Sequence, residues 1–102
     1  MVKYRITPIY NIKGSYQSNY MEGDIPTTAT NINMLRKRLI DKYYGKAAFV
    51  HVYYDNRKTL GILWFMDGIM WKTIDYIPNY GQIHTYYAVK KDGSLGRILK
   101  KK

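Results

Sequence analysis

The chain is dominated by strand-like segments, and only one part of it has helical periodicity. After residue 46, five segments rich in Val, Ile, Tyr and Trp follow one another, each separated from the next by turn residues. These segments are Ala47–Tyr54, Leu60–Met66, Ile69–Ile77, Ile83–Lys90 and Leu95–Leu99. Because successive strands joined by short turns pair antiparallel, this part of the chain predicts a meander.

The turns between these segments predict how the strands pair. Asp67-Gly68 and Asp92-Gly93 are favoured in two-residue type I′ turns, where both central residues need positive φ. Turn length sets the register, and the register decides which side chains share a face. With Asp67-Gly68 as a two-residue turn we predict Trp64 opposite Trp71, and with Asn56-Arg57 as the central residues of the preceding turn we predict Phe49 opposite Trp64.

The N-terminal half supplies one more strand and the helix. Val2–Tyr10 alternates apolar and polar residues, which predicts a strand with one wet face. Asn11–Thr30 is rich in Gly, Ser, Asn and Thr and predicts a long loop, with a short strand at Tyr16–Met21. Thr30 or Asn31 can cap a helix that runs to about Tyr44 and ends at Gly45. The apolar arc of this helix consists of Ile32, Leu35, Leu39, Ile40 and Tyr43.

Arg36 lies inside that apolar arc. One interpretation is a side chain that snorkels at the edge of the core. The other is a guanidinium that points into a functional site.

Together these segments predict an α+β fold. It is an antiparallel β-meander of five to six strands with one amphipathic helix packed on one face, in the order β-α-β-β-β-β-β. A chain of 102 residues is expected to form a single domain, residues 1–102.

A single helix cannot cover both faces of such a sheet, and the predicted registers place an aromatic surface on the uncovered face. Exposed apolar patches of this kind mark interaction sites. We therefore predict a partner or homodimer interface there. Its residues are Phe49, His51, Tyr53, Trp64 and Trp71.

The chain is also strongly basic, with 17 Lys and Arg against 7 Asp and Glu and a net charge of +10. Such a balance favours a polyanionic partner, and tyrosines interleaved with cations supply stacking platforms for bases. The last hairpin carries the densest set of these residues. We predict that it binds nucleic acid through His84, Tyr86, Lys90, Lys91, Arg97, Lys100 and Lys101.

Several chemistries lack the residues that they need. Cys is absent, which excludes disulfides, zinc fingers and a thiol nucleophile. No GxxxxGK[ST] loop is present, and seven scattered carboxylates are few for a two-metal nuclease. We predict no metal, no cofactor and no catalytic residue.

The first hypothesis is therefore a non-enzymatic protein that binds RNA or single-stranded DNA, encoded by a phage or plasmid and located in the cytoplasm. A second is a homodimeric, anti-CRISPR-like inhibitor that binds a host defence nucleoprotein. A third is a metal-free endoribonuclease toxin, because the chain is similar in size and charge to toxins of the RelE type.

Overall fold

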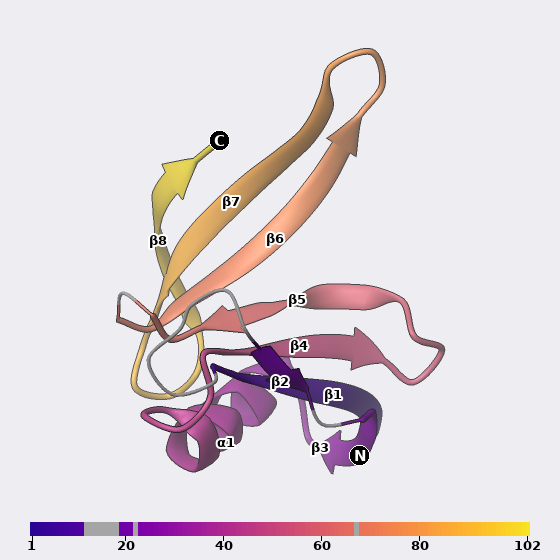
Figure 1. Ribbon diagram of the computed structural model, residues 1–102, viewed down its shortest axis with the longest axis vertical. Helices are drawn as coiled ribbons and strands as arrows, with labels where there is room; N and C mark the ends of the chain where they lie inside the picture. Colours follow the sequence, from indigo (N-terminus) through magenta and orange to yellow (C-terminus); the bar gives the residue numbers. More distant parts are fainter. Residues whose placement is uncertain (12–18, 22, 67) are drawn as a thin grey trace.

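The computed structural model describes residues 1–11, 19–21, 23–66 and 68–102 and contains an antiparallel sheet with one helix packed against it (Figure 1). The α+β class is thus confirmed. Among the described residues, eight strands pair in the order β2-β1-β4-β5-β6-β7-β8, with β3 also on β1. The elements are β1 (Val2–Asn11), β2 (Asn19–Met21), β3 (Ile25–Ala29), α1 (Ile32–Tyr43), β4 (Phe49–Tyr54), β5 (Thr59–Trp64), β6 (Met70–Ile77), β7 (Gly81–Val89) and β8 (Leu95–Lys101).

The predicted meander of the last five strands is confirmed, but the predicted element order is wrong. Three strands precede the helix, because the segment predicted as a loop contains β3, which pairs with Val2–Ile6 of β1. The Gly, Ser, Asn and Thr content of Asn11–Thr30 predicted a loop, but β3 is an edge strand, where even Pro26 is tolerated. The short strand predicted at Tyr16–Met21 is observed as β2, while residues 16–18 lie outside the described residues.

The helix begins and ends as its sequence predicts. The Asn31 side chain accepts a hydrogen bond from the Met34 N–H at 3.0 Å, which caps the first turn. Gly45, just beyond the helix, has φ +84°, a conformation that favours glycine. None of the helices in the described part of the chain has the length and hydropathy that crossing a membrane requires.

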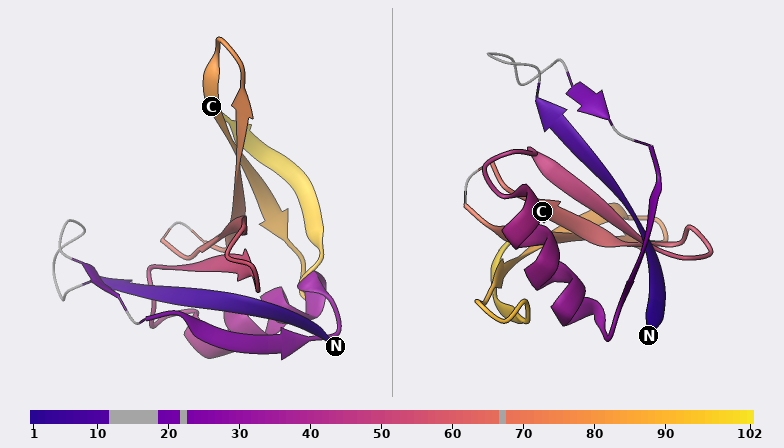
Figure 2. Two further views of the ribbon diagram at one scale, coloured as in Figure 1. Left: turned by 90° about the vertical axis from the view of Figure 1, so that its right-hand side faces the viewer. Right: turned by 90° about the horizontal axis from the view of Figure 1, so that it is seen from below.

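The core lies between α1 and one face of the sheet (Figure 2). Residues at i, i+4 and i+8 of the helix bury the same stripe, as the period of 3.6 requires. The sheet contributes alternate residues of each strand. The main members are Leu35, Leu39 and Tyr43 from α1 and Tyr4, Ile6, Val50, Val52, Leu63 and Trp71 from the sheet.

Arg36 follows neither interpretation made from the sequence. Its side chain is buried, and its Nε donates a hydrogen bond to the Gly93 carbonyl at 2.7 Å. A further bond goes to Asn33 Oδ1, and the guanidinium lies 4.8 Å from the centre of the Trp71 ring. Arg36 therefore fastens the β7–β8 turn to the helix.

The far ends of β6 and β7 extend beyond the rest of the sheet as an arm (Figures 1 and 2). The last β5–β6 pair is Ile62 with Lys72, whereas β6 pairs with β7 as far as Ile77. Within the described residues the outer half of β6 therefore has no β5 partner, and a groove of about 680 Å³ opens between the two strands.

Candidate nucleic-acid interface

The face of the sheet opposite α1 carries a continuous row of rings. Residues that are partners across antiparallel strands share a face, and Phe49 pairs with Trp64 as predicted. Their rings stack with centroids 5.2 Å apart and planes 8° apart. Along β4, Phe49 is 5.6 Å from His51, and His51 stacks on Tyr53 at 6.1 Å. We call Trp64, Phe49, His51 and Tyr53 the aromatic row; each side chain is partly exposed.

Two lysines extend the aromatic row across β6, β7 and β8. The Lys72 ammonium is 5.5 Å from the Trp64 ring centre and 5.7 Å from that of Tyr86. The Lys100 ammonium lies 4.6 Å from the Tyr86 ring centre. Tyr86 is thus placed near two cations. Such contacts are worth about 0.5–1 kcal/mol at exposed sites and hold the ammonium groups beside the rings.

The electrostatics of this face favour a neutral imidazole within a positive surround. Burial lowers the pKa of His51, and the positive charge of Lys72 lowers that pKa further. His51 therefore adds a ring with one donor and one acceptor, while Lys72 and Lys100 carry the charge. The surface combines flat rings with cations a few ångströms from them.

Four of the five residues predicted for the aromatic interface lie on this face, and Trp71 does not. Trp71 pairs with Leu63, not with Trp64, and is only 3% exposed within the core. Asp67 lies outside the described residues, but the register predicted from Asp67-Gly68 was wrong by one residue. A slip of one residue moves every side chain of a strand to the other face. The observed partner of Trp64 is Met70.

The predicted basic hairpin is divided between several surfaces. Tyr86 pairs with Lys100 and lies on the aromatic face, whereas Lys101 pairs with Thr85 and lies on the other face. His84 pairs with Ile74 and so lies on the aromatic face with Tyr86, where it is half-buried. Register shifts in the β7–β8 pair cause this division.

Of the remaining predicted cations, Lys90 and Lys91 lie away from Tyr86. Lys90 and Lys91 line a pocket with Lys37, Ile40 and Asp41 of the helix, so they lie on the helix side. Arg97 is exposed on β8, within the register shift between Leu95 and Ile98. Lys90 and Lys91 thus do not join the aromatic row.

Lys72 is the residue that sequence reasoning missed. It pairs with Ile62 on one side and with Tyr86 on the other, which places it at the centre of the face. The alternation of side chains along β6 could have revealed its position. With Trp64 opposite Met70, alternation along β6 puts Met70, Lys72 and Ile74 on the aromatic face.

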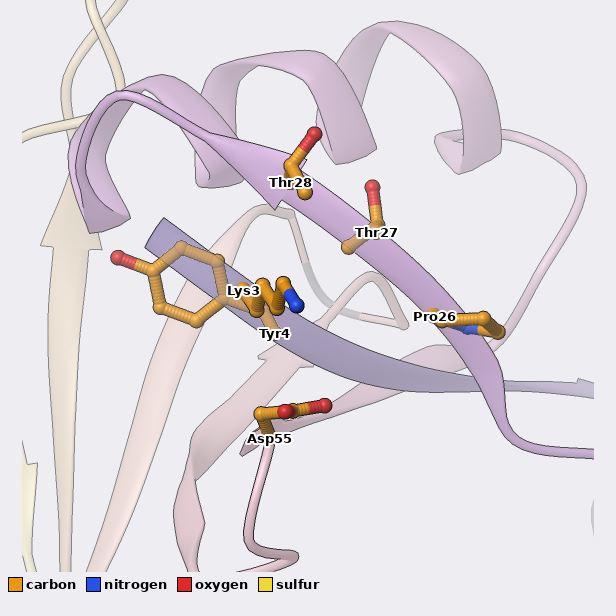
Figure 3. A pocket seen from close by; sticks show the side chains of 6 residues that line it. All are labelled: Lys3, Tyr4, Pro26, Thr27, Thr28 and Asp55. Atoms are coloured by element: carbon orange, nitrogen blue, oxygen red, sulfur yellow. The ribbon is translucent and has the colours of Figure 1, made fainter. Parts of the chain in front are cut away.

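A second pocket, of about 370 Å³, lies between β1 and β3, and its side chains do not converge (Figure 3). In that view the hydroxyl groups of Thr27 and Thr28 point away from Asp55. Burial raises the pKa of the Tyr4 hydroxyl, which lines the same pocket. Among the described residues, no group of three or more His, Asp or Glu side chains is placed to hold a metal ion.

Comparison of the chain with models of known protein families, with curated proteins and with solved structures finds no match in any of the three.

Proposed function

We propose that this protein binds single-stranded nucleic acid, RNA or single-stranded DNA, along the aromatic row and the Lys72–Tyr86–Lys100 stack. The observation that carries the proposal is the Tyr86 ring with lysine ammonium groups at 5.7 and 4.6 Å, beside the stacked Phe49–Trp64 pair. Rings offer stacking surfaces to bases, and the ammonium groups offer charge to phosphates. One face of the sheet thus offers both the stacking surfaces and the positive charge that a single nucleic-acid strand requires.

The partner is proposed to be single-stranded because flat rings on a sheet can stack only on bases that are free of a duplex. The helix lies on the opposite face of the sheet, with Lys37 and Arg38 exposed on it, and shows no long basic surface for a major groove. The net charge of +10 supports an anionic partner and leads us to expect a strong salt dependence.

Binding to fluorescently labelled U12 and dT12 tests this proposal. Tyr86→Ala is expected to weaken binding about 5- to 150-fold, because stacking on one ring contributes roughly 1–3 kcal/mol per base. Tyr44→Ala is the matched control, since Tyr44 is an exposed tyrosine beside the helix, away from the aromatic row and from the arm. Lys100→Ala is expected to reduce the slope of log affinity against log salt by about 0.7.

Equal affinities for wild type and Tyr86→Ala would reject this surface. Equal losses from Tyr86→Ala and Tyr44→Ala would reject it as well. Cleavage of the labelled RNA would instead favour the toxin hypothesis.

A second candidate function, self-association, is favoured by the arm. Four apolar side chains on it are open to solvent: Ile74, Tyr76, Ile77 and Tyr80. We propose that two copies pair through this arm about a twofold axis, because identical strand edges then run antiparallel. Lys58 and Asp75 both line the adjoining groove, so a twofold axis can bring opposite charges of the two copies together.

Sedimentation velocity distinguishes this candidate. Wild type is expected to sediment as a dimer, and Ile74→Ser combined with Tyr76→Ser as a monomer, since both apolar contacts are then removed. Tyr44→Ser, at an exposed tyrosine beside the helix, is expected to leave the dimer intact. A monomeric wild type at high micromolar concentration would rule the arm out as a dimer contact.

A further inference from the structure

A pocket of about 230 Å³ lies at the end of the aromatic row, lined by Asp24, Tyr53 and Arg57. Tyr53 belongs to both features, because its ring stacks on His51 within the row. A strand of nucleic acid that follows the row therefore reaches this pocket with its next base. We call it the Asp24 pocket.

The Asp24 carboxylate is held in place by three neighbours. Its Oδ1 accepts a hydrogen bond from the Thr7 hydroxyl at 3.0 Å. Its Oδ2 lies 3.5 Å from Arg5 Nε and 3.4 Å from Arg57 Nη1. A carboxylate offers about four lone pairs, so these contacts leave acceptor capacity for a ligand. The side chain is still 33% exposed.

The charges around the Asp24 pocket cancel. Arg5 also lies 3.9 Å from Asp55, so the cluster contains two arginines and two aspartates. A site without excess positive charge has little to offer a phosphate. It does offer a fixed acceptor beside a guanidinium donor, which is the chemistry that recognises the edge of a base.

Guanine is the base that fits this pair of groups. Its Watson–Crick edge presents two neighbouring donors, the N1–H and the 2-amino group, which a carboxylate can accept together. Its O6 and N7 are acceptors that suit an arginine. Uracil and adenine each present a single donor group between or beside acceptors, so they match the carboxylate less well.

The β4–β5 turn fixes the backbone of Arg57. Arg57 has φ +70°, in the left-handed region where glycine is favoured. Its N–H donates to the Tyr54 carbonyl at 2.9 Å, which closes the β4–β5 turn. The side chain is 72% exposed and yet extends to Asp24. The turn thus holds the Arg57 backbone near Asp24 and leaves its guanidinium accessible to a ligand.

We propose that the Asp24 pocket binds a guanine base of the bound strand, with Asp24 accepting from N1–H and the 2-amino group, Arg57 donating to O6, and Tyr53 stacking on the ring. This inference rests on the proposed function. It adds a base preference to a surface that otherwise binds without regard to sequence.

The test compares U12 with the same strand carrying one central guanosine or one inosine, which lacks the 2-amino group. Wild type is expected to prefer the guanosine strand about tenfold over U12 and to lose most of that preference with inosine. Asp24→Asn is expected to abolish the preference, so that the guanosine strand and U12 bind with equal affinity. Asp41→Asn, at an exposed aspartate on the helix, is the control and retains the preference.

A further variant guards against loss of structure in Asp24→Asn. Arg57→Lys keeps the charge but loses the planar donor, and it is expected to reduce the guanosine preference severalfold. Tight binding of U12 without any guanosine preference would overturn this inference alone. A guanosine preference that survives in Asp24→Asn would do the same. Failure to bind any of the strands would overturn the proposed function and the inference with it.

Discussion

His51 lies in the middle of the aromatic row, where its ring contacts Phe49 and Tyr53. Burial first, and the charge of Lys72 second, lower its pKa. Protonation of this imidazole would place a second positive charge in a half-buried position beside Lys72. His51 therefore links the stability of the face to pH.

The expected pH dependence follows from the direction of that shift. An unfolded histidine titrates near 6.5, and the folded His51 binds its proton at a lower pH. The stability from His51 is fully present above pH 6.5 and is lost as the pH falls towards the folded pKa. Urea unfolding at pH 7.5, 6.0 and 5.0 is expected to show a larger loss for wild type than for His51→Gln. Parallel losses in the two proteins would contradict this.

At the scale of the element, the β7–β8 turn decides which residues share a face. The Gly93 N–H donates to the Lys90 carbonyl at 2.9 Å, and the Lys90 N–H donates to the Ser94 carbonyl at 2.8 Å. This is a three-residue turn with glycine in its left-handed position, and not the predicted two-residue turn. The Ser94 hydroxyl bond to Asp92 lowers the pKa of that carboxyl and holds the turn.

The same turn packs so closely against the helix that a side chain at Gly93 would clash with it. A Cβ at Gly93 would lie 1.9 Å from the Asn33 carbonyl oxygen, whereas a Cβ at Gly45 would meet nothing within 4 Å. Both glycines have positive φ. Gly45→Ala is expected to cost about 1–2 kcal/mol of unfolding free energy through φ alone. Gly93→Ala is expected to cost about 1–3 kcal/mol more through overpacking.

Chemical denaturation of both variants measures this difference. A midpoint for Gly93→Ala equal to that of Gly45→Ala would show that the β7–β8 turn is not held against the helix. The bond from Arg36 to the Gly93 carbonyl would then contribute little in solution.

At the scale of the whole molecule, the two faces of the sheet differ in how far they are buried. The helix and the aliphatic face form the core, and Trp71 completes it by packing over Gly61, where a Cβ would come within 2.3 Å of the indole. On the opposite face Ile62 and Met70 are buried, but the aromatic row, Lys72 and Tyr86 stay partly exposed. This is the surface that the excess of strands over helices predicted.

Local chemistry was enough to predict the helix with its Asn31 cap, the five-strand meander and the Phe49–Trp64 pair. Each depends on periodicity or on residues close in sequence. The sequence did not predict the burial of Trp71, the position of Lys72 or the Asp24 pocket. Strand side chains alternate with a period of two, so one residue more or less in a turn exchanges the faces. The turn length depends on packing between residues far apart in the sequence, such as Gly93 against Asn33 and Trp71 against Gly61. These contacts exist only once the chain has folded.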